Sequence, residues 1–118
     1  MTLARVKIGP VVYSIVEVPN LHDGGDGLDG QVEYTAAEIR LREGLSPQRR
    51  AVVLWHELIH AILENAGQDP GHGVIDAVAY GVYGLLSENP ELAKYAGGWG
   101  SWPEDSARTG LGACRGLP

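Results

Sequence analysis

Residues 52–62 read VVLWHELIHAI, an apolar run that carries three ionisable side chains. Burying polar groups without partners costs free energy, so these side chains need a reason to be there. His56 and His60 are four residues apart, and on an α-helix this spacing places both imidazoles on the same face. The run therefore predicts a buried helix in which His56, Glu57 and His60 have a chemical role.

The flanking residues predict where this helix begins and ends. Ser46 is a preferred N-cap residue, and Pro47 suits the first helical position. Gly67 is typical of the residue just past a helix C-terminus. Because the helix is apolar on most sides around Leu54, we expect it to be central and largely buried.

The residues before this helix predict a small sheet. Residues 5–18 are rich in Val, Ile and Tyr, with an interruption at Gly9-Pro10, and residues 31–34 and 37–43 alternate in polarity. Residues 19–30 have the composition of turns, and their acidic spacing does not match an EF-hand calcium loop. We expect three antiparallel strands in a meander, with residues 37–43 at the edge of the sheet.

The residues after the helix predict a second helix and a tail. Residues 74–89 form a helical pattern that ends at Asn89-Pro90, and residues 97–118 lack periodicity. The predicted fold class is α+β, with a three-stranded antiparallel sheet packed on the central helix and a second, antiparallel helix. We expect one domain over residues 1–96 and an irregular Gly-rich tail over residues 97–118.

Composition limits the expected partners. The net charge is −6 and there is no basic run, so nucleic acid is not an expected partner. Arg49-Arg50 are interpreted as part of a solvated helix face. No apolar run reaches the roughly 18 residues that span a bilayer, and the start of the chain does not resemble a signal peptide. With Cys114 as the single cysteine, an internal disulfide is excluded. We expect a cytoplasmic protein without a membrane partner, and no oligomeric state is favoured.

His56, Glu57 and His60 form the pattern H-E-x-x-H, where x is any residue. Both imidazoles can reach one zinc ion at about 2.0–2.1 Å, and Glu57 projects beside the metal, where it can accept a proton from a bound water. The alternative to a metal site is a structural role, in which hydrogen bonds to other protein groups satisfy the two histidines. The spacing and the buried context favour zinc.

A catalytic zinc site normally has three protein ligands and one open position. The candidates for the third ligand are Asp76, His72 and, further along the second helix, Glu88. A carboxylate matches the two-histidine, one-carboxylate pattern of hydrolytic zinc, so we favour Asp76 over His72. Asp76 also suits the first turn of a helix electrostatically. Tyr80 and Tyr83 follow on the same face and are candidates for hydrogen bonding to an oxyanion, or for core packing.

The HELIH motif and the ENPEL sequence after the second helix (residues 88–92) resemble the small phage-type ImmA/IrrE-like metallopeptidases, also called minigluzincins. The resemblance covers residues 5–95. It implies one zinc ion per chain, with His56 and His60 as ligands and Glu57 as general base. The usual third ligand of that family is a glutamate in an E-x-x-A pattern, and the matching residue here is Asp76, whose side chain is one methylene shorter.

These observations predict a zinc metallopeptidase that hydrolyses peptide bonds with a metal-activated water in a bacterial or phage-infected cell. The resemblance implies a narrow protein target such as a repressor. An extended substrate is expected to add to the exposed sheet edge. The alternative from another class is a catalytically silent, zinc-containing binding or regulatory module of the same fold. Hydrolysis of a non-peptide amide is a third possibility.

Overall fold

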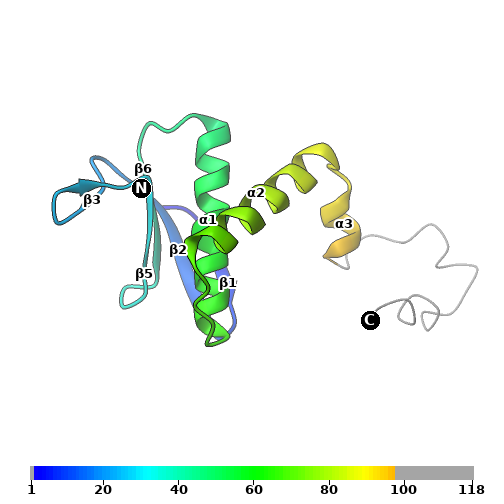
Figure 1. Cartoon of the computed structure of the whole chain (residues 1–118), viewed down its shortest axis with the longest axis horizontal. Helices are drawn as coiled ribbons and strands as arrows, with labels where there is room; N and C mark the ends of the chain where they lie inside the picture. The colour runs from blue at the N-terminus through cyan, green and yellow to red at the C-terminus, as the bar shows by residue number, and fades with distance from the viewer. Residues whose placement is uncertain (1, 98–118) are drawn as a thin grey trace, which may run out of the picture. The chain divides into compact units, whose positions relative to one another are not determined.

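The computed structural model describes residues 2–97 (Figure 1). Its elements, in chain order, are β1 (Thr2–Ile8), β2 (Val11–Val18), β3 (His22–Asp23), β4 (Asp26–Gly27), β5 (Gly30–Glu33), β6 (Glu38–Arg42), α1 (Pro47–Asn65), α2 (His72–Glu88) and α3 (Leu92–Ala96). Backbone contacts divide the chain after Gly84 into two units, which are described separately. The predicted tail lies outside the described residues except for Gly97.

The first unit is an α+β fold built on a four-stranded sheet with the strand order β1-β2-β6-β5. The β1–β2 and β5–β6 pairs are antiparallel, whereas β2 and β6 run parallel. The predicted three-stranded antiparallel sheet is therefore wrong in strand number and in direction, although the α+β class is confirmed.

The extra strand arises because the chain turns at Gly9-Pro10, so that residues 5–18, expected as one strand, belong to β1 and β2. Ile8 pairs directly with Val11, so Gly9 and Pro10 form the whole turn of a hairpin. Gly9 has φ +58, and two-residue hairpin turns favour glycine at a first position with positive φ. Gly9 also lies directly against the side chain of Asn65 in α1, which leaves no space for a Cβ atom.

The parallel pair requires a crossover, and residues 19–37 supply it. This connection contains the β3–β4 hairpin and the whole of β5 before the chain returns to the sheet in β6. Arg42 holds this connection in place with two hydrogen bonds. Its Nε donates to the carbonyl of Leu28 and its Nη2 to the carbonyl of Leu21, both at 2.8 Å. Because β6 lies between β2 and β5, the prediction that residues 37–43 form the sheet edge is wrong; the edges are β1 and β5.

The core lies between the sheet and α1, which run side by side in Figure 1. Ile39 and Leu41 alternate with half-buried polar residues along β6 and are 0% and 1% exposed. They pack with other buried side chains of the sheet and of α1, namely Ile8, Tyr13, Ile15, Val53 and Ala61. The central position predicted for this helix is confirmed, because it packs against both the sheet and α2. The prediction that it is largely buried is wrong, because four of its 19 residues are buried and Ile62 is 47% exposed.

Both ends of α1 follow from the sequence. Ser46 Oγ accepts a hydrogen bond from the backbone N–H of Arg49 at 3.2 Å, and Pro47 is the first helical residue. Gly67 follows the helix with φ +73, a left-handed conformation that favours glycine. The turn that follows leads into α2, which buries Ile75 and Ala79 against Ile59 of α1.

The described part of the second unit, up to Gly97, contains the end of α2 and the short α3. Asn89 Nδ2 donates to the carbonyl of Leu85 at 2.9 Å, and Lys94 pairs with Glu91 at 3.2 Å. None of the helices within residues 2–97 has the length and apolar character needed to cross a bilayer.

Candidate metal centre

Three imidazoles converge at the junction of α1 and α2. His56 and His60 project from successive turns of α1, and His72 is the first residue of α2. Each offers one ring nitrogen within 4.8 Å of the other two. Their ring centroids lie 4.7 to 5.6 Å apart. Among residues 2–97, this is the group of side chains able to share a metal ion.

The geometry of the two α1 histidines fits zinc. Their Nε2 atoms lie 3.1 Å apart. Tetrahedral zinc with bonds of about 2.0–2.1 Å places two ligand nitrogens about 3.3 Å apart. The pKa of His60 is lowered, first by burial and then by the neighbouring His56 and His72, and this favours the neutral ring that a metal requires. The donor set is therefore suited to zinc.

Asp76 lies behind His56 rather than within the group. Its Oδ1 atom is 2.8 Å from Nδ1 of His56, so the carboxylate accepts a hydrogen bond from that nitrogen. A proton fixed on Nδ1 leaves the lone pair of Nε2 directed toward His60. The sequence had favoured Asp76 over His72 as the third ligand; the structure brings His72 to the other two rings and Asp76 to the outer nitrogen of one of them.

Glu57 is the buried acid of the site. It is 8% exposed, and burial raises the pKa of its carboxyl group to about 7. Its side chain lies against Gly30 at the start of β5, where an added Cβ atom would be 3.1 Å from Oε2 and 2.5 Å from Cγ1 of Val53. Glycine at this position therefore allows β5 to approach α1 closely.

Two cavities open on either side of Glu57, with volumes of about 330 and 420 Å³. They share His56, Glu57 and Gly30 in their linings, so together they form one cleft between β5 and the two helices. The larger cavity contains His60 and His72 and reaches Tyr34, whose hydroxyl donates to the carbonyl of His60 at 3.4 Å. We call this the lower end of the cleft.

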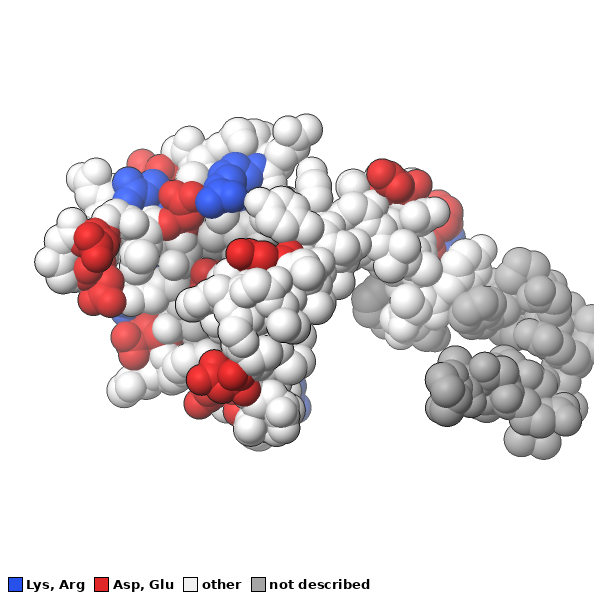
Figure 2. Space-filling view, viewed as in Figure 1, with Lys and Arg blue, Asp and Glu red and all other residues white. Residues whose placement is uncertain are grey.

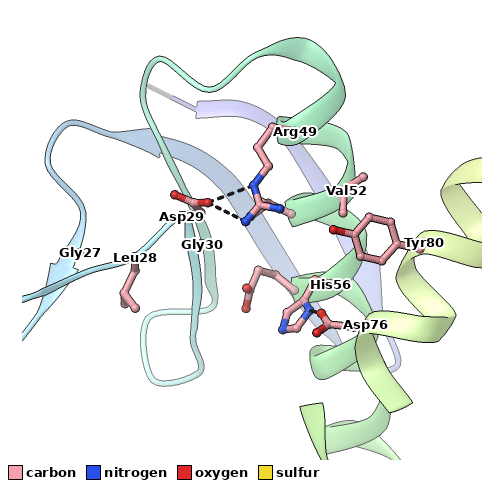
Figure 3. A pocket seen from close by; sticks show the side chains of 11 residues that line it. Gly27, Leu28, Asp29, Gly30, Arg49, Val52, His56, Asp76 and Tyr80 are labelled. Carbon is pink, nitrogen blue, oxygen red and sulfur yellow. Dashed lines mark hydrogen bonds and ion pairs between the residues drawn. The ribbon is translucent and has the colours of Figure 1, made fainter. Parts of the chain in front are cut away.

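The smaller cavity, the upper end of the cleft, reaches Arg49 and Tyr80 (Figure 3). Arg49 donates from Nε and Nη2 to Oδ2 of Asp29 at 3.0 and 2.8 Å. The pKa of Arg49 is raised, first by this hydrogen bond and further by the charge of Asp29 and by the nearby Tyr80. Of the two tyrosines predicted beside the site, Tyr80 lines the cleft and Tyr83 is not among the residues that line its two cavities.

Sequence reasoning missed Arg49. The pair Arg49-Arg50 was interpreted as a solvated face, yet the two side chains have different surroundings. Arg50 pairs with Glu17 of β2 at 3.3 Å, whereas Arg49 pairs with Asp29 beside the cleft. On the face shown in Figure 2, most of the visible Lys and Arg surface gathers in one place beside acidic side chains. The available signal was helical spacing, because Arg49 precedes His56 by two turns and shares its face.

Comparisons with protein-family models, with characterised proteins and with solved structures found no match to this chain. The resemblance to ImmA/IrrE-like metallopeptidases therefore stays a prediction that rests on the HELIH and ENPEL residues.

Proposed function

We propose that this chain is a zinc-dependent hydrolase of peptide bonds in which His56, His60 and His72 hold the ion. The observation that carries the proposal is the convergence of these three imidazoles beside the buried Glu57 carboxyl group in an open cleft. A zinc ion there would supply Lewis acidity and would lower the pKa of a water molecule toward 7.

In the proposed mechanism, Glu57 transfers the proton between the attacking water and the leaving amine. Burial raises the pKa of Glu57 to about 7 in the metal-free chain, so its carboxylate is more basic than an exposed one. Beside the ion, this carboxylate would take a proton from the attacking water and pass it to the leaving amine. The close approach of Gly30 in β5 to this side chain limits the water around it.

Asp76 is a positioning residue. By accepting the Nδ1 proton of His56, it keeps the ring in the orientation and tautomer in which Nε2 is free to bind the metal. The proposal therefore assigns His72 as the third ligand and gives Asp76 the role of supporting His56.

The exposed edge of β5 is the proposed track for the substrate. β5 follows the direction of α1, since Gly30 lies against Glu57 while Tyr34, just past the strand, bonds the carbonyl of His60. An extended peptide that pairs with this edge would cross the cleft directly over Glu57. This proposal replaces the β6 edge that the sequence suggested.

Metal analysis combined with a substitution tests the function. The purified protein should contain one zinc ion per chain, and Glu57→Gln should retain the ion while hydrolysis of a complex peptide mixture, read by mass spectrometry, is lost. Glu43→Gln, an exposed carboxylate between β6 and α1, is the matched control and should retain both. A protein that binds no zinc would overturn the proposal. A zinc-loaded protein that leaves every peptide intact would instead identify the silent binding module.

A further inference from the structure

The upper end of the cleft combines donors from two helices. Arg49 comes from the first turn of α1 and Tyr80 from the middle of α2, and Figure 3 shows the Tyr80 hydroxyl directed toward Arg49. Asp29, directly before β5, approaches from the opposite wall. Both side chains project from helices, which position a site more precisely than loops do.

Arg49 has donors to spare. Its bonds to Asp29 involve two of its five N–H groups and only one carboxylate oxygen. The Tyr80 hydroxyl points toward Arg49, and because a guanidinium has no acceptor, the O–H proton of Tyr80 is available to a ligand. A guanidinium N–H and a phenol O–H that face one cavity can both donate hydrogen bonds to a carboxylate.

Asp29 is a replaceable partner. The side chains of Arg49 and Asp29 are 50% and 39% exposed, and ion pairs this accessible to water contribute little net free energy. Arg42 lies 3.8 Å from the other oxygen of Asp29, so this aspartate keeps a cation when Arg49 turns to a ligand. The two arginines thus share one carboxylate, which leaves capacity for a second.

The position of Arg49 sets a distance along the substrate. Arg49 precedes His56 by seven residues, which is about 10 Å along an α-helix. An extended peptide advances about 3.3 Å per residue, so a group bound at Arg49 is about three residues from the peptide bond at the metal site.

We infer that Arg49 and Tyr80 form a subsite for a substrate carboxylate about three residues from the cleaved bond. This inference rests on the proposed function and adds a substrate preference to it. The carboxylate belongs either to an Asp or Glu side chain or to the C-terminus of the substrate. In the structure, Asp29 accepts the Arg49 hydrogen bonds that this group would accept.

The first experiment measures where cleavage occurs. Wild-type protein acts on peptides from a digested cell lysate, and the cut sites are read by mass spectrometry. We expect enrichment of Asp, Glu or a free C-terminus about three residues from the cut. Arg49→Gln should lose the enrichment, whereas Arg50→Gln, which removes the neighbouring charge paired with Glu17, should keep it. Enrichment at internal acids identifies the side chain as the source, and enrichment at chain ends identifies the C-terminus.

The second experiment measures binding without turnover. Zinc-loaded Glu57→Gln protein is titrated with peptides that carry the carboxylate and with matched peptides that carry an amide. The carboxylate form should bind about tenfold more tightly or better, as expected for a charged hydrogen bond, and adding Arg49→Gln should abolish the difference. Adding Asp29→Asn should tighten carboxylate binding because the internal competitor is removed. Misfolding cannot produce that gain.

The outcomes separate the two proposals. Hydrolysis without a carboxylate preference would overturn the subsite and leave the peptidase standing. A carboxylate preference in binding that depends on Arg49, in a wild-type protein that cleaves nothing, would support the subsite and overturn the peptidase. Equal affinity for acid and amide peptides, or no peptide binding at all, would overturn the subsite.

Discussion

Gly30→Ala should destabilise the protein, although alanine is a small and otherwise favourable residue. The new Cβ atom would lie 2.5 Å from Cγ1 of Val53 and 3.1 Å from Cγ of Glu57. Carbon atoms in contact normally lie about 3.5–4.0 Å apart, so the approach to Val53 is too close by about 1 Å. Val53 is 6% exposed and belongs to the main core, so it cannot swing into solvent.

The magnitude follows from the cost of overpacking. Relief of the clash requires β5 to move away from α1 or Val53 to leave its preferred rotamer. Insertions of this kind cost about 1–3 kcal/mol. For a domain of this size, that corresponds to a melting temperature lower by about 5–15 °C.

Thermal and denaturant unfolding of the chelator-treated protein measures this effect without a contribution from metal. The control is the same substitution at Gly81, an exposed interior position of α2 where an added Cβ atom meets nothing within 4 Å. Gly81→Ala should stabilise the protein by about 1 kcal/mol because alanine has the higher helix propensity. The close approach of β5 to α1 is refuted if Gly30→Ala unfolds at or above the wild-type temperature.

Other substitutions test the site and the core. In metal-free protein, Glu57→Gln should be close to wild-type stability at pH 4.5. Because burial raises the pKa of Glu57 from 4.5 to about 7, the wild-type fold loses stability as the pH rises from 4.5 to 7, and the loss levels off above that. The variant should therefore be more stable by about 3 kcal/mol at pH 9. Parallel pH profiles in urea would contradict this. Asp76→Asn should weaken zinc binding by about 10–100-fold in chelator competition, and His72→Ala should weaken it further; the reverse order would make Asp76 the ligand. Ser46→Ala should cost about 1 kcal/mol through the lost N-cap, and an unchanged urea midpoint would exclude the cap. Ile39→Ala, at a position that is 0% exposed, should cost about 2–5 kcal/mol, and a loss below 1 kcal/mol would contradict its place in the core.

The helices could be predicted from the sequence because their signals are local. Ser46, Pro47 and Gly67 mark the ends of α1 within a few residues of the backbone groups that they satisfy. The i, i+4 spacing of His56 and His60 likewise fixes their common face without reference to the rest of the chain.

The sheet could not be predicted in the same way because its order is set at long range. The insertion of β6 between β2 and β5 depends on a parallel pairing, Ile15 with Ile39, between residues far apart in the sequence. Turn residues in the 19–30 segment indicated irregular structure, and the two-residue strands of the β3–β4 hairpin are too short to show alternation. The proximity of His72 to His56 could not be predicted for a similar reason, since it depends on the packing of α2 on α1.

In the crossover between β2 and β6, the residues that stabilise the sheet differ from the residues that line the cleft. The strands at its two ends are fixed by pairing with each other, while the connecting residues supply Leu28, Asp29 and Gly30 to the cleft wall. The β3–β4 hairpin is exposed and contributes no residue to the main core. Insertions and deletions in residues 22–27 would therefore be tolerated by the scaffold, and this hairpin is where variants with altered substrate choice should be sought by directed evolution.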